Sequence, residues 1–418
     1  MRVVYVDTGM VGEVGHHAMS CRLITRALRD RGHEVTIATW AALDPSLCAE
    51  FQARTVFRRN TYGVSDGDPL CGWLATYFVT SHETTEDFAA LGPFRPDDLL
   101  YVNSVLPAQL HAVYNFLVAL PEGARPQTVV ELGTDPGVEF ILTDGAIAFA
   151  ARDPRADARA TLYRFTARQM SARRLENLHL VTFDRTSSEV YSALLGIPVG
   201  TMPLPHLAMG TPHCRGSDNG PRTIAFLGHQ RGEKGYHLVP EIIRHLLGER
   251  ADIRLLLHNA QPDGMAETQR QIRGLAASDD RIELDERSAG PQLWQSLLNR
   301  ADVVVCPYLV DRFRAAYSAL ASEAIASAIP LVVPEHTTLA RLMRDFESGG
   351  ACFDRPEPDA VAAAIDRVLD DFDTQAQRAM AAATRWVDTM GAGRMVETML
   401  ACVGSAMMER RAPFHLAA

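Results

Sequence analysis

The sequence has few of the features that mark disulfide-rich, metal-binding and membrane-spanning proteins. Its seven cysteines are odd in number, stand singly and form no CxxC pair, which argues against a disulfide framework or a zinc site and favours a reducing cytoplasm. No apolar run approaches the roughly 18 residues of a membrane span, and the first strand reaches Asp7 too early for a signal peptide. Peripheral contact with a membrane is left open but has no support in the sequence.

Long runs of one charge sign are also absent. Charged residues make up 22% of the chain, the formal net charge is -10, and no run of Lys and Arg stands out. This pattern argues against nucleic acid or an anionic membrane as the main partner. The apolar fraction of 47% is ample for burial, and 418 residues exceed what one core usually holds. Two domains of about 200 residues each are therefore expected.

The first half of the chain alternates strand-like and helix-like segments. A β-rich run over 2–9 is followed by a segment of helical periodicity and a second β-rich run, and Gly32 after Arg29 and Arg31 is typical of a helix end. Further strands are expected at 98–104, 128–133 and 178–184, and helices at 111–120, 162–175 and 188–195. The alternation predicts a parallel sheet covered on both faces, in an N-terminal Rossmann-like domain over 1–205.

A stretch rich in Pro, Gly, Ser and Asn then interrupts all periodicity, and we interpret 206–221 as a linker. The alternation resumes at 223–229 and continues to the hydrophobic run at 330–336, which predicts a second Rossmann-like domain over 222–383. The remaining segment, 384–418, has the pattern of terminal helices that return to the first domain. The predicted fold class is thus α/β, with two doubly wound domains facing each other across a cleft.

Open parallel sheets bind ligands at the carboxyl ends of their strands, which directs attention to the loops there. In the loop over 7–20, Gly12 and Gly15 allow a ligand to approach the backbone, and the next helix offers free N–H groups to an anion. The spacing is not that of GxGxxG, so a nicotinamide cofactor is disfavoured. His16 and His17 could bind a phosphate or sugar hydroxyl; a plain turn and a helix-capping histidine are the alternatives.

The loop after the strand at 223–227 carries two cations. Arg231 and Lys234 stand just before a helix start, where both could meet a diphosphate together with the helix N-terminus. Exposed, solvated side chains are the alternative. No Ser or Thr follows a Gly-Lys pair, so a P-loop is not predicted.

A single carboxylate lies in the apolar helical run near 320. Ser318 is placed to cap this helix, and Glu323 follows about one and a half turns later. A carboxylate there can accept hydrogen bonds from two vicinal ribose hydroxyls. A surface Glu on an amphipathic helix is the alternative, and the apolar neighbours Leu320, Ala324 and Ile325 weaken it.

With these motifs the second half resembles the donor-binding domain of family-four-type glycosyltransferases with the GT-B fold. Gly228 and the EKG at 233–235 keep the family spacing, and YSALASEA at 317–324 matches the second half of the family's paired-glutamate motif. ADVVVCP at 301–307 and IPLVV at 329–333 are similar to supporting segments. In the first half, RALRDRGHEVTIAT at 26–39 resembles the start of the family's acceptor domain, and LLGIPV at 194–199 resembles its last part.

The resemblance implies a metal-independent hexosyl or related transfer from a nucleotide-diphosphate sugar, with retention of configuration. Lys234 would contact the diphosphate and Glu323 the ribose, so that positive groups stabilise the leaving group. No cofactor besides this co-substrate is implied. The residues expected to bind the donor are Gly12, Gly15, His16, Gly228, His229, Lys234, Tyr317, Ser318, Ala319 and Glu323, and the catalytic candidates are Lys234, Arg231 and His17.

The chain departs from the family pattern at several positions. The first glutamate of the pair is Ala315, the Arg after the strand glycine is His229, and the glycine before the Ile-Pro step is Ala328. Asp311 or Arg314 is a conceivable substitute for the missing carboxylate contact.

In the first domain, Glu131 and Asp135 are expected on a strand-end loop that faces the cleft and are candidates for positioning the acceptor. A structural turn is the alternative for Asp135, since Asp-Pro-Gly favours turns. The sequence thus predicts a cytoplasmic glycosyltransferase that uses a nucleotide-sugar donor and an unknown acceptor. Two alternatives stay open: a degenerate, non-catalytic nucleotide-sugar-binding protein, and a nucleotide-sugar epimerase of similar architecture.

Overall fold

The computed structural model describes residues 1–13, 15–63, 69–133, 136–143, 146–150, 157–206, 212, 220–260 and 264–411. The chain forms two compact units. The first comprises Met1–Pro205 together with the chain from Ala392 onward, and the second is His206–Gly391. Helix α14 (Phe372–Met390) runs unbroken across the expected boundary at 384, so the return to the first unit begins with α15 (Ala392–Arg411).

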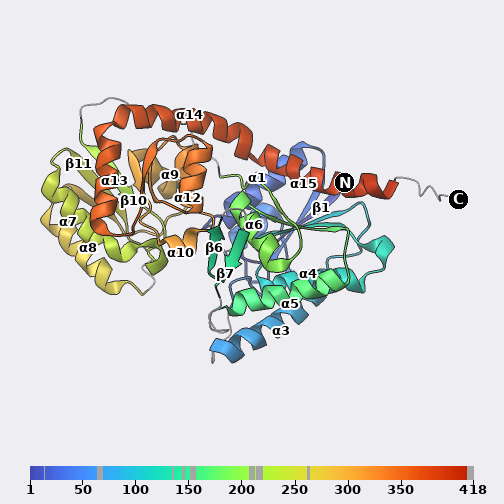
Figure 1. The fold of residues 1–418 in the computed structure, drawn as a ribbon. Coiled ribbons are helices and arrows are strands. Elements are labelled where there is room, and N and C mark those ends of the chain that lie inside the picture. Colours follow the sequence, from blue (N-terminus) through green and yellow to red (C-terminus); the bar gives the residue numbers. More distant parts are fainter. Residues whose placement is uncertain are drawn as a thin grey trace. The chain divides into compact units, whose positions relative to one another are not determined.

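The first unit contains a seven-stranded parallel sheet in the order β3-β2-β1-β4-β5-β8-β9 and a separate antiparallel pair, β6-β7 (Figure 1). Its elements before α15 are β1 (Arg2–Asp7), α1 (His17–Asp30), β2 (Glu34–Trp40), α2 (Pro45–Phe51), β3 (Arg54–Phe57), α3 (Pro69–Ala89), β4 (Leu99–Val102), α4 (Pro107–Ala119), η1 (Glu122–Ala124), β5 (Gln127–Glu131), β6 (Phe140–Thr143), β7 (Ala146–Phe149), α5 (Ala158–Ala172), β8 (Leu178–Thr182), α6 (Arg185–Leu195) and β9 (Val199–Thr201).

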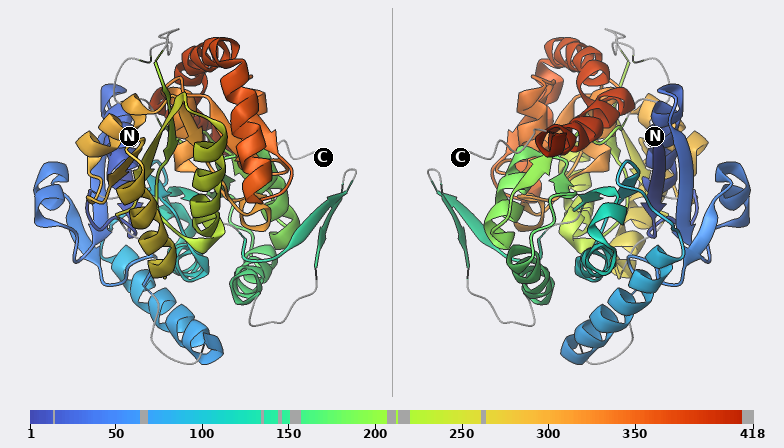
Figure 2. Two further views of the ribbon diagram at one scale, coloured as in Figure 1. Left: turned by 90° about the vertical axis from the view of Figure 1, so that its left-hand side faces the viewer. Right: turned by 90° about the vertical axis from the view of Figure 1, so that its right-hand side faces the viewer.

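Alternating side chains of this sheet fill two cores, because successive residues of a strand face opposite sides. Val4 and Val6 join the core formed with α3, α4, α5 and α6, whereas Val3 and Tyr5 join the core formed with α1 and α15. Figure 1 shows α3, α4 and α5 side by side, and the two views in Figure 2 show the β6-β7 hairpin projecting from the rest of this unit.

The second unit is a six-stranded parallel sheet in the order β12-β11-β10-β13-β14-β15. Its elements before α14 are β10 (Arg222–Phe226), η2 (Gly232–Lys234), η3 (Tyr236–Leu238), α7 (Val239–Glu249), β11 (Ile253–His258), α8 (Ala266–Ser278), β12 (Ile282–Asp285), α9 (Pro291–Arg300), β13 (Val303–Val305), α10 (Val310–Phe313), α11 (Ala319–Ala326), β14 (Leu331–Pro334), α12 (Thr338–Asp345), β15 (Gly350–Phe353) and α13 (Pro358–Asp370).

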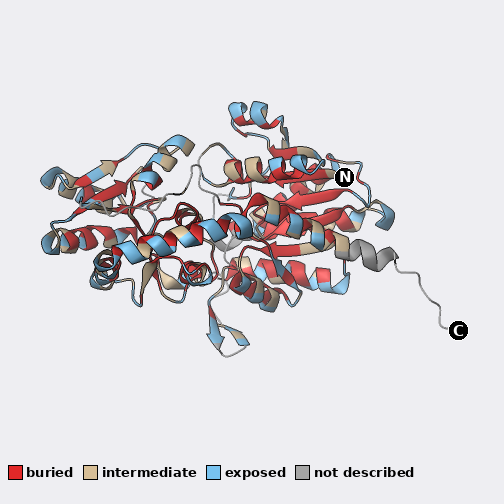
Figure 3. Ribbon diagram, turned by 90° about the horizontal axis from the view of Figure 1, so that it is seen from above, coloured by how far each residue is buried: buried red, intermediate tan, exposed pale blue. Residues whose placement is uncertain are grey.

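This sheet is also buried on both faces, one covered by α9, α11, α12 and α14 and the other by α7, α8 and α13. In Figure 3 the strands are mostly red, and many helices are red along one side and pale blue along the other. Both units are therefore doubly wound α/β layers, as the alternation predicted.

The helix signals in the sequence act where they were expected. Helix α1 ends at Asp30 with Gly32 in the left-handed region at φ +77°. The Ser318 side chain caps α11 by accepting a hydrogen bond from the Ala321 N–H at 3.3 Å. Several elements had no clear signal, among them α2, β3 and α3 in the first unit. Most of the expected linker, at 207–211 and 213–219, lies outside the described residues.

Candidate active site

The basic turn of the second unit follows strand β10. Gly228 adopts φ +96°, and Gly235, directly after Lys234, adopts φ +66°. A Cβ at Gly235 would lie 1.7 Å from the backbone oxygen of Pro307, so only glycine fits there. The turn therefore packs tightly against the segment after β13, and this contact holds Lys234 in place.

Lys234 points into this unit. Its Nζ lies 5.4 Å from the centre of the Tyr308 ring, and a Cβ placed on Gly228 would be 3.9 Å from it. Burial lowers the pKa of Lys234 below its ordinary value, because the charged form loses water. Lys234 lines a pocket together with Gly228, His229 and Tyr308. A half-buried cation in the turn after a parallel strand is suited to an anionic ligand.

Arg231 takes a different position from Lys234. Its side chain is 46% exposed and its Nη1 lies 3.9 Å from Glu233 Oε1. Arg231 is not one of the described residues that line the pocket of Lys234. The sequence expected both cations at one anion, and the structure places only Lys234 against the pocket.

Helix α11 approaches the basic turn from another part of the unit. A Cβ on Gly228 would lie 3.9 Å from Leu320 Cδ2, so the first turn of α11 meets the β10 end at the glycine that also faces Lys234. The charge of Glu323 contributes to raising the pKa of Lys234, although burial dominates and lowers it. The two motifs that the sequence linked therefore lie in one region.

Glu323 is already held by two neighbours in this structure. Its Oε2 accepts a hydrogen bond from Trp294 Nε1 at 2.7 Å, and its Oε1 lies 3.5 Å from His206 Nδ1. The His206 ring stacks on Tyr317, with the ring centres 5.8 Å apart. A carboxylate offers about four acceptor positions, so these contacts leave capacity for further donors. No pattern in the sequence predicted the Trp294 contact, which joins α9 to α11.

Positions where the chain departs from the family pattern are visible as well. Ala315, in the place of the first glutamate, is 3% exposed and belongs to the core of the unit. Arg314 Nη2 lies 3.3 Å from Asp311 Oδ1, so the two candidate substitutes pair with each other.

In the first unit, the loop after β1 holds a buried acid–histidine pair. Asp7 is fully buried and His17 is 7% exposed, and His17 Nδ1 lies 2.9 Å from both Asp7 oxygens. Asp7 also accepts hydrogen bonds from the Gly9 N–H and from Asn103 Nδ2, at 3.0 and 2.8 Å. Burial favours the neutral imidazole, but the charge and hydrogen bond of Asp7 outweigh it and raise the pKa of His17.

His17 Nε2 lies 3.0 Å from the hydroxyl of Tyr62, which follows β3. His16 is the N-cap residue of α1 but makes no side-chain cap hydrogen bond, and its ring stacks on His17 with the centres 4.3 Å apart. Gly15 adopts φ +93°, and a Cβ on Gly12 would meet nothing within 4 Å. The sequence singled out the histidines and glycines but missed Asp7, the last residue of an apolar strand.

Glu131 is the last residue of β5 rather than part of a loop, and it is fully buried. Its Oε2 accepts hydrogen bonds from the Ser104 N–H at 2.8 Å and from Ser104 Oγ at 3.3 Å. Burial raises the pKa of Glu131 to about 8. Asp135, the other residue proposed on the acceptor side, lies outside the described residues.

Two doubly wound units in one chain have the architecture of the GT-B fold. Residues 189–397, half of the chain, match the model of the family described as Family 4 Glycosyltransferase in conflict systems. The chain belongs to this family, as the resemblance of its motifs predicted, and it is a glycosyltransferase. A search of curated proteins finds no match.

Solved structures share the fold over nearly the whole chain. Sucrose-phosphate synthase from Thermosynechococcus elongatus is 16% identical with a TM-score of 0.66, and the match covers 98% of this chain and 100% of that one. HepE from Anabaena, solved in complex with UDP, is 14% identical with a TM-score of 0.62 and coverages of 97% and 100%. A putative UDP-N-acetylglucosamine 2-epimerase from Listeria monocytogenes is 13% identical, with a TM-score of 0.61 and coverages of 100% and 99%.

None of the helices in the described part is long and apolar enough to cross a bilayer. Within the same residues there is no group of three or more His, Cys, Asp or Glu side chains arranged to hold a metal ion.

Proposed function

We propose that the protein moves a hexosyl or related glycosyl group from a nucleotide-diphosphate sugar to an acceptor hydroxyl. The reaction proceeds with retention and needs neither a metal nor a cofactor beyond the co-substrate. The observation that carries this proposal is the half-buried side chain of Lys234, which lines a pocket beside the contact between the β10 turn and the first turn of α11. HepE has been solved in complex with UDP and with UDP and glucose, which supports a nucleotide sugar as donor.

The roles follow from the charge of the leaving group. As the glycosidic bond breaks, negative charge grows on the diphosphate, and Lys234 with the free N–H groups of α11 is positioned to stabilise it. Because Lys234 is partly shielded from water, its attraction for an anion is stronger than that of an exposed lysine. Glu323 accepts hydrogen bonds from the ribose hydroxyls with the acceptor positions that Trp294 and His206 leave open.

The first experiment measures release of nucleoside diphosphate from a panel of nucleotide sugars, with and without acceptor alcohols. Lys234→Ala is expected to weaken nucleotide binding by about 10- to 100-fold, because a hydrogen bond to a charged group contributes about 1.5–3 kcal/mol. Glu323→Ala is expected to weaken it as well. Arg270→Ala, which removes an exposed cation on α8, is the matched control and should bind like the wild type.

Other outcomes would favour the alternatives. Nucleotide affinity that is equal in the wild type and Lys234→Ala contradicts the assigned donor site. Thermal stabilisation by nucleotide without turnover of any donor favours a binding protein, which the alanine at position 315 motivates. Conversion of the donor sugar without an acceptor favours an epimerase. Loss of turnover with a chelator, or an inverted anomeric configuration in the NMR spectrum of the product, contradicts the proposed mechanism.

A further inference from the structure

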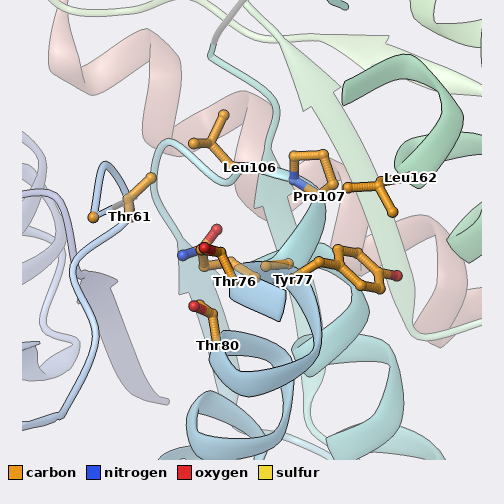
Figure 4. A pocket seen from close by; sticks show the side chains of 10 residues that line it. Thr61, Thr76, Tyr77, Thr80, Leu106, Pro107 and Leu162 are labelled. Carbon is orange, nitrogen blue, oxygen red and sulfur yellow. The ribbon is translucent and has the colours of Figure 1, made fainter. Parts of the chain in front are cut away.

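The first unit contains a pocket whose lining includes none of the residues assigned to the donor. It lies between α3, the start of α4 and α5, next to the segment after β3, and it is open to solvent (Figure 4). Leu106 and Pro107 follow the carboxyl end of β4, so the pocket lies where parallel sheets place their ligands. The lining residues are Thr61, Gly63, Thr76, Tyr77, Thr80, Leu106, Pro107, Ala108, Gln109 and Leu162.

The pocket has mostly apolar walls, and three threonines and Gln109 also line it. Leu106, Pro107, Ala108 and Leu162 contribute hydrocarbon, and in Figure 4 the Tyr77 ring extends toward Leu162. Gln109 is only 3% exposed, and its Oε1 makes no hydrogen bond within the described part of the chain. A buried acceptor without a donor is costly, and a ligand that offers an N–H or O–H group would remove that cost.

The pocket wall is connected to the Asp7–His17 pair. Thr61, which lines the pocket, shares a hydrogen bond of 2.6 Å with Thr8, the residue after Asp7. The next residue, Tyr62, places its hydroxyl 3.0 Å from His17 Nε2. The segment after β3 thus contacts both the pocket and the histidine, which puts a ligand in the pocket close to the polar end of β1.

Apolar side chains near the pocket are exposed. Phe78 is 57% exposed and Phe165 is 42% exposed, and their ring centres lie 5.4 and 6.2 Å from that of Tyr77. Leu74, one helical turn before Phe78 on α3, is 43% exposed. Because Tyr77 also lines the pocket, the apolar surface of the pocket continues outward to Leu74, Phe78 and Phe165. Large exposed apolar groups beside an apolar pocket mark a surface that binds apolar matter.

We infer that this pocket binds the acceptor, and that the acceptor is an apolar ring compound, an aromatic or alicyclic alcohol with a second hydrogen-bond donor for Gln109. The inference rests on the proposed function, since it assigns the acceptor of that transfer. In the reaction the acceptor oxygen forms a bond to the anomeric carbon while the bond from that carbon to the diphosphate oxygen breaks. The hydroxyl proton passes to the departing diphosphate.

The test uses the full chain and two fluorescent probes, 2-naphthol and 2,6-dihydroxynaphthalene. In the wild type we expect both to bind by fluorescence titration, and the second hydroxyl to tighten binding by about 2- to 10-fold, the contribution of one hydrogen bond. Gln109→Leu should abolish this difference while 2-naphthol still binds. Ala108→Leu, which fills the pocket with hydrocarbon, should weaken both probes at least tenfold without changing the thermal shift produced by UDP.

The outcomes of this test distinguish a failure of the pocket assignment from a failure of the proposed function. Equal binding of the probes to the wild type and Ala108→Leu, or no binding to the wild type, overturns the inference. A naphthyl glycoside formed by the wild type and lost in Ala108→Leu supports it. Release of nucleoside diphosphate by sugar hydrolysis, with no naphthyl glycoside from any donor, overturns the acceptor assignment and leaves the donor site standing. If no donor is consumed, the proposed function fails, and the titrations alone decide whether the pocket binds ring alcohols.

Discussion

Glu131 shows how one buried carboxyl group constrains the end of a strand. Its Oε2 holds the backbone and hydroxyl of Ser104, which adopts φ +52°, whereas its Oε1 has no hydrogen-bond partner among the described residues. A carboxylate in this setting keeps few of the contacts that water would supply, so burial raises the pKa of Glu131 to about 8. The neutral acid is therefore the stable form in the folded chain near neutral pH.

This shift makes the stability depend on pH. The folded pKa of Glu131, about 8, lies above the ordinary value of 4.5, so its stabilising contribution is complete below about pH 4.5 and is lost as the pH rises toward 8. Over that window the group lowers the free energy of unfolding by about 1.4 kcal/mol per pH unit. Glu131→Gln, which imitates the neutral acid, should abolish this dependence, so urea unfolding is expected to show the wild type losing stability relative to the variant from about pH 5 to pH 8.

The matched control is Glu249→Gln at the exposed end of α7. The free energy of unfolding of this variant should differ from that of the wild type by the same small amount at every pH between about 5 and 8. A difference between the wild type and Glu131→Gln that stays constant with pH would show that Glu131 is ionised in the folded chain.

At the scale of elements, the basic turn between β10 and α7 depends on glycines that differ in their surroundings. Gly235 has a positive φ and faces the Pro307 carbonyl, so the turn and the segment after β13 are in backbone contact. Gly232, three residues earlier, has room for a side chain, because a Cβ there would lie 3.8 Å from Met265 Cε, an ordinary van der Waals distance. The position of Lys234 is thus determined by a contact between two elements.

Gly235→Ala is expected to lower the free energy of unfolding by at least about 2 kcal/mol, because the new Cβ meets a backbone oxygen and the left-handed conformation strains alanine. It should also weaken UDP binding at least tenfold by displacing Lys234. Calorimetric titration and thermal unfolding measure both effects. Gly232→Ala is the control and should resemble the wild type. Wild-type affinity in Gly235→Ala would mean that the turn does not position Lys234.

At the scale of the whole molecule, the end of the chain completes the core of the first unit. Helix α15 packs against α1, and Met395, Val396 and Met399 are fully buried in the core that contains Ile24 and Leu28. Arg31 Nη2 adds a hydrogen bond to the Gly393 backbone oxygen at 3.1 Å. The first unit is therefore built from both ends of the chain, and its stability depends on residues that follow the second unit in sequence.

Met395→Ala should lower the free energy of unfolding of the first unit by about 2–5 kcal/mol, the usual cost of removing a large buried side chain. Arg394→Ala, which removes an exposed ion pair with Glu397, is expected to cost about 0.5 kcal/mol. Urea unfolding followed by limited proteolysis separates the two units. If both variants lose the same small amount, α15 does not contribute to the core as described.

The sequence alone determined the features that depend on neighbours along the chain. Alternating β-rich and helical periodicity predicted two doubly wound units, because burial of one strand or helix face imposes a spacing that is visible locally. Gly32 and Ser318 predicted a helix end and a helix start, since each acts within a few residues of itself. Lys234 and Glu323 were found from motif spacing, although their roles remain proposals.

Only the tertiary structure decided which distant residues meet. The contacts of Asp7 with His17 and Asn103, of Glu323 with Trp294, and of Glu131 with Ser104 join different elements, and no local pattern records them. The pocket beside Gln109 has the same origin, because it is bounded by segments from β3 to α5. Burial, and with it the pKa of a buried group, is a property of the packed chain, so the sequence names these residues without showing their environment.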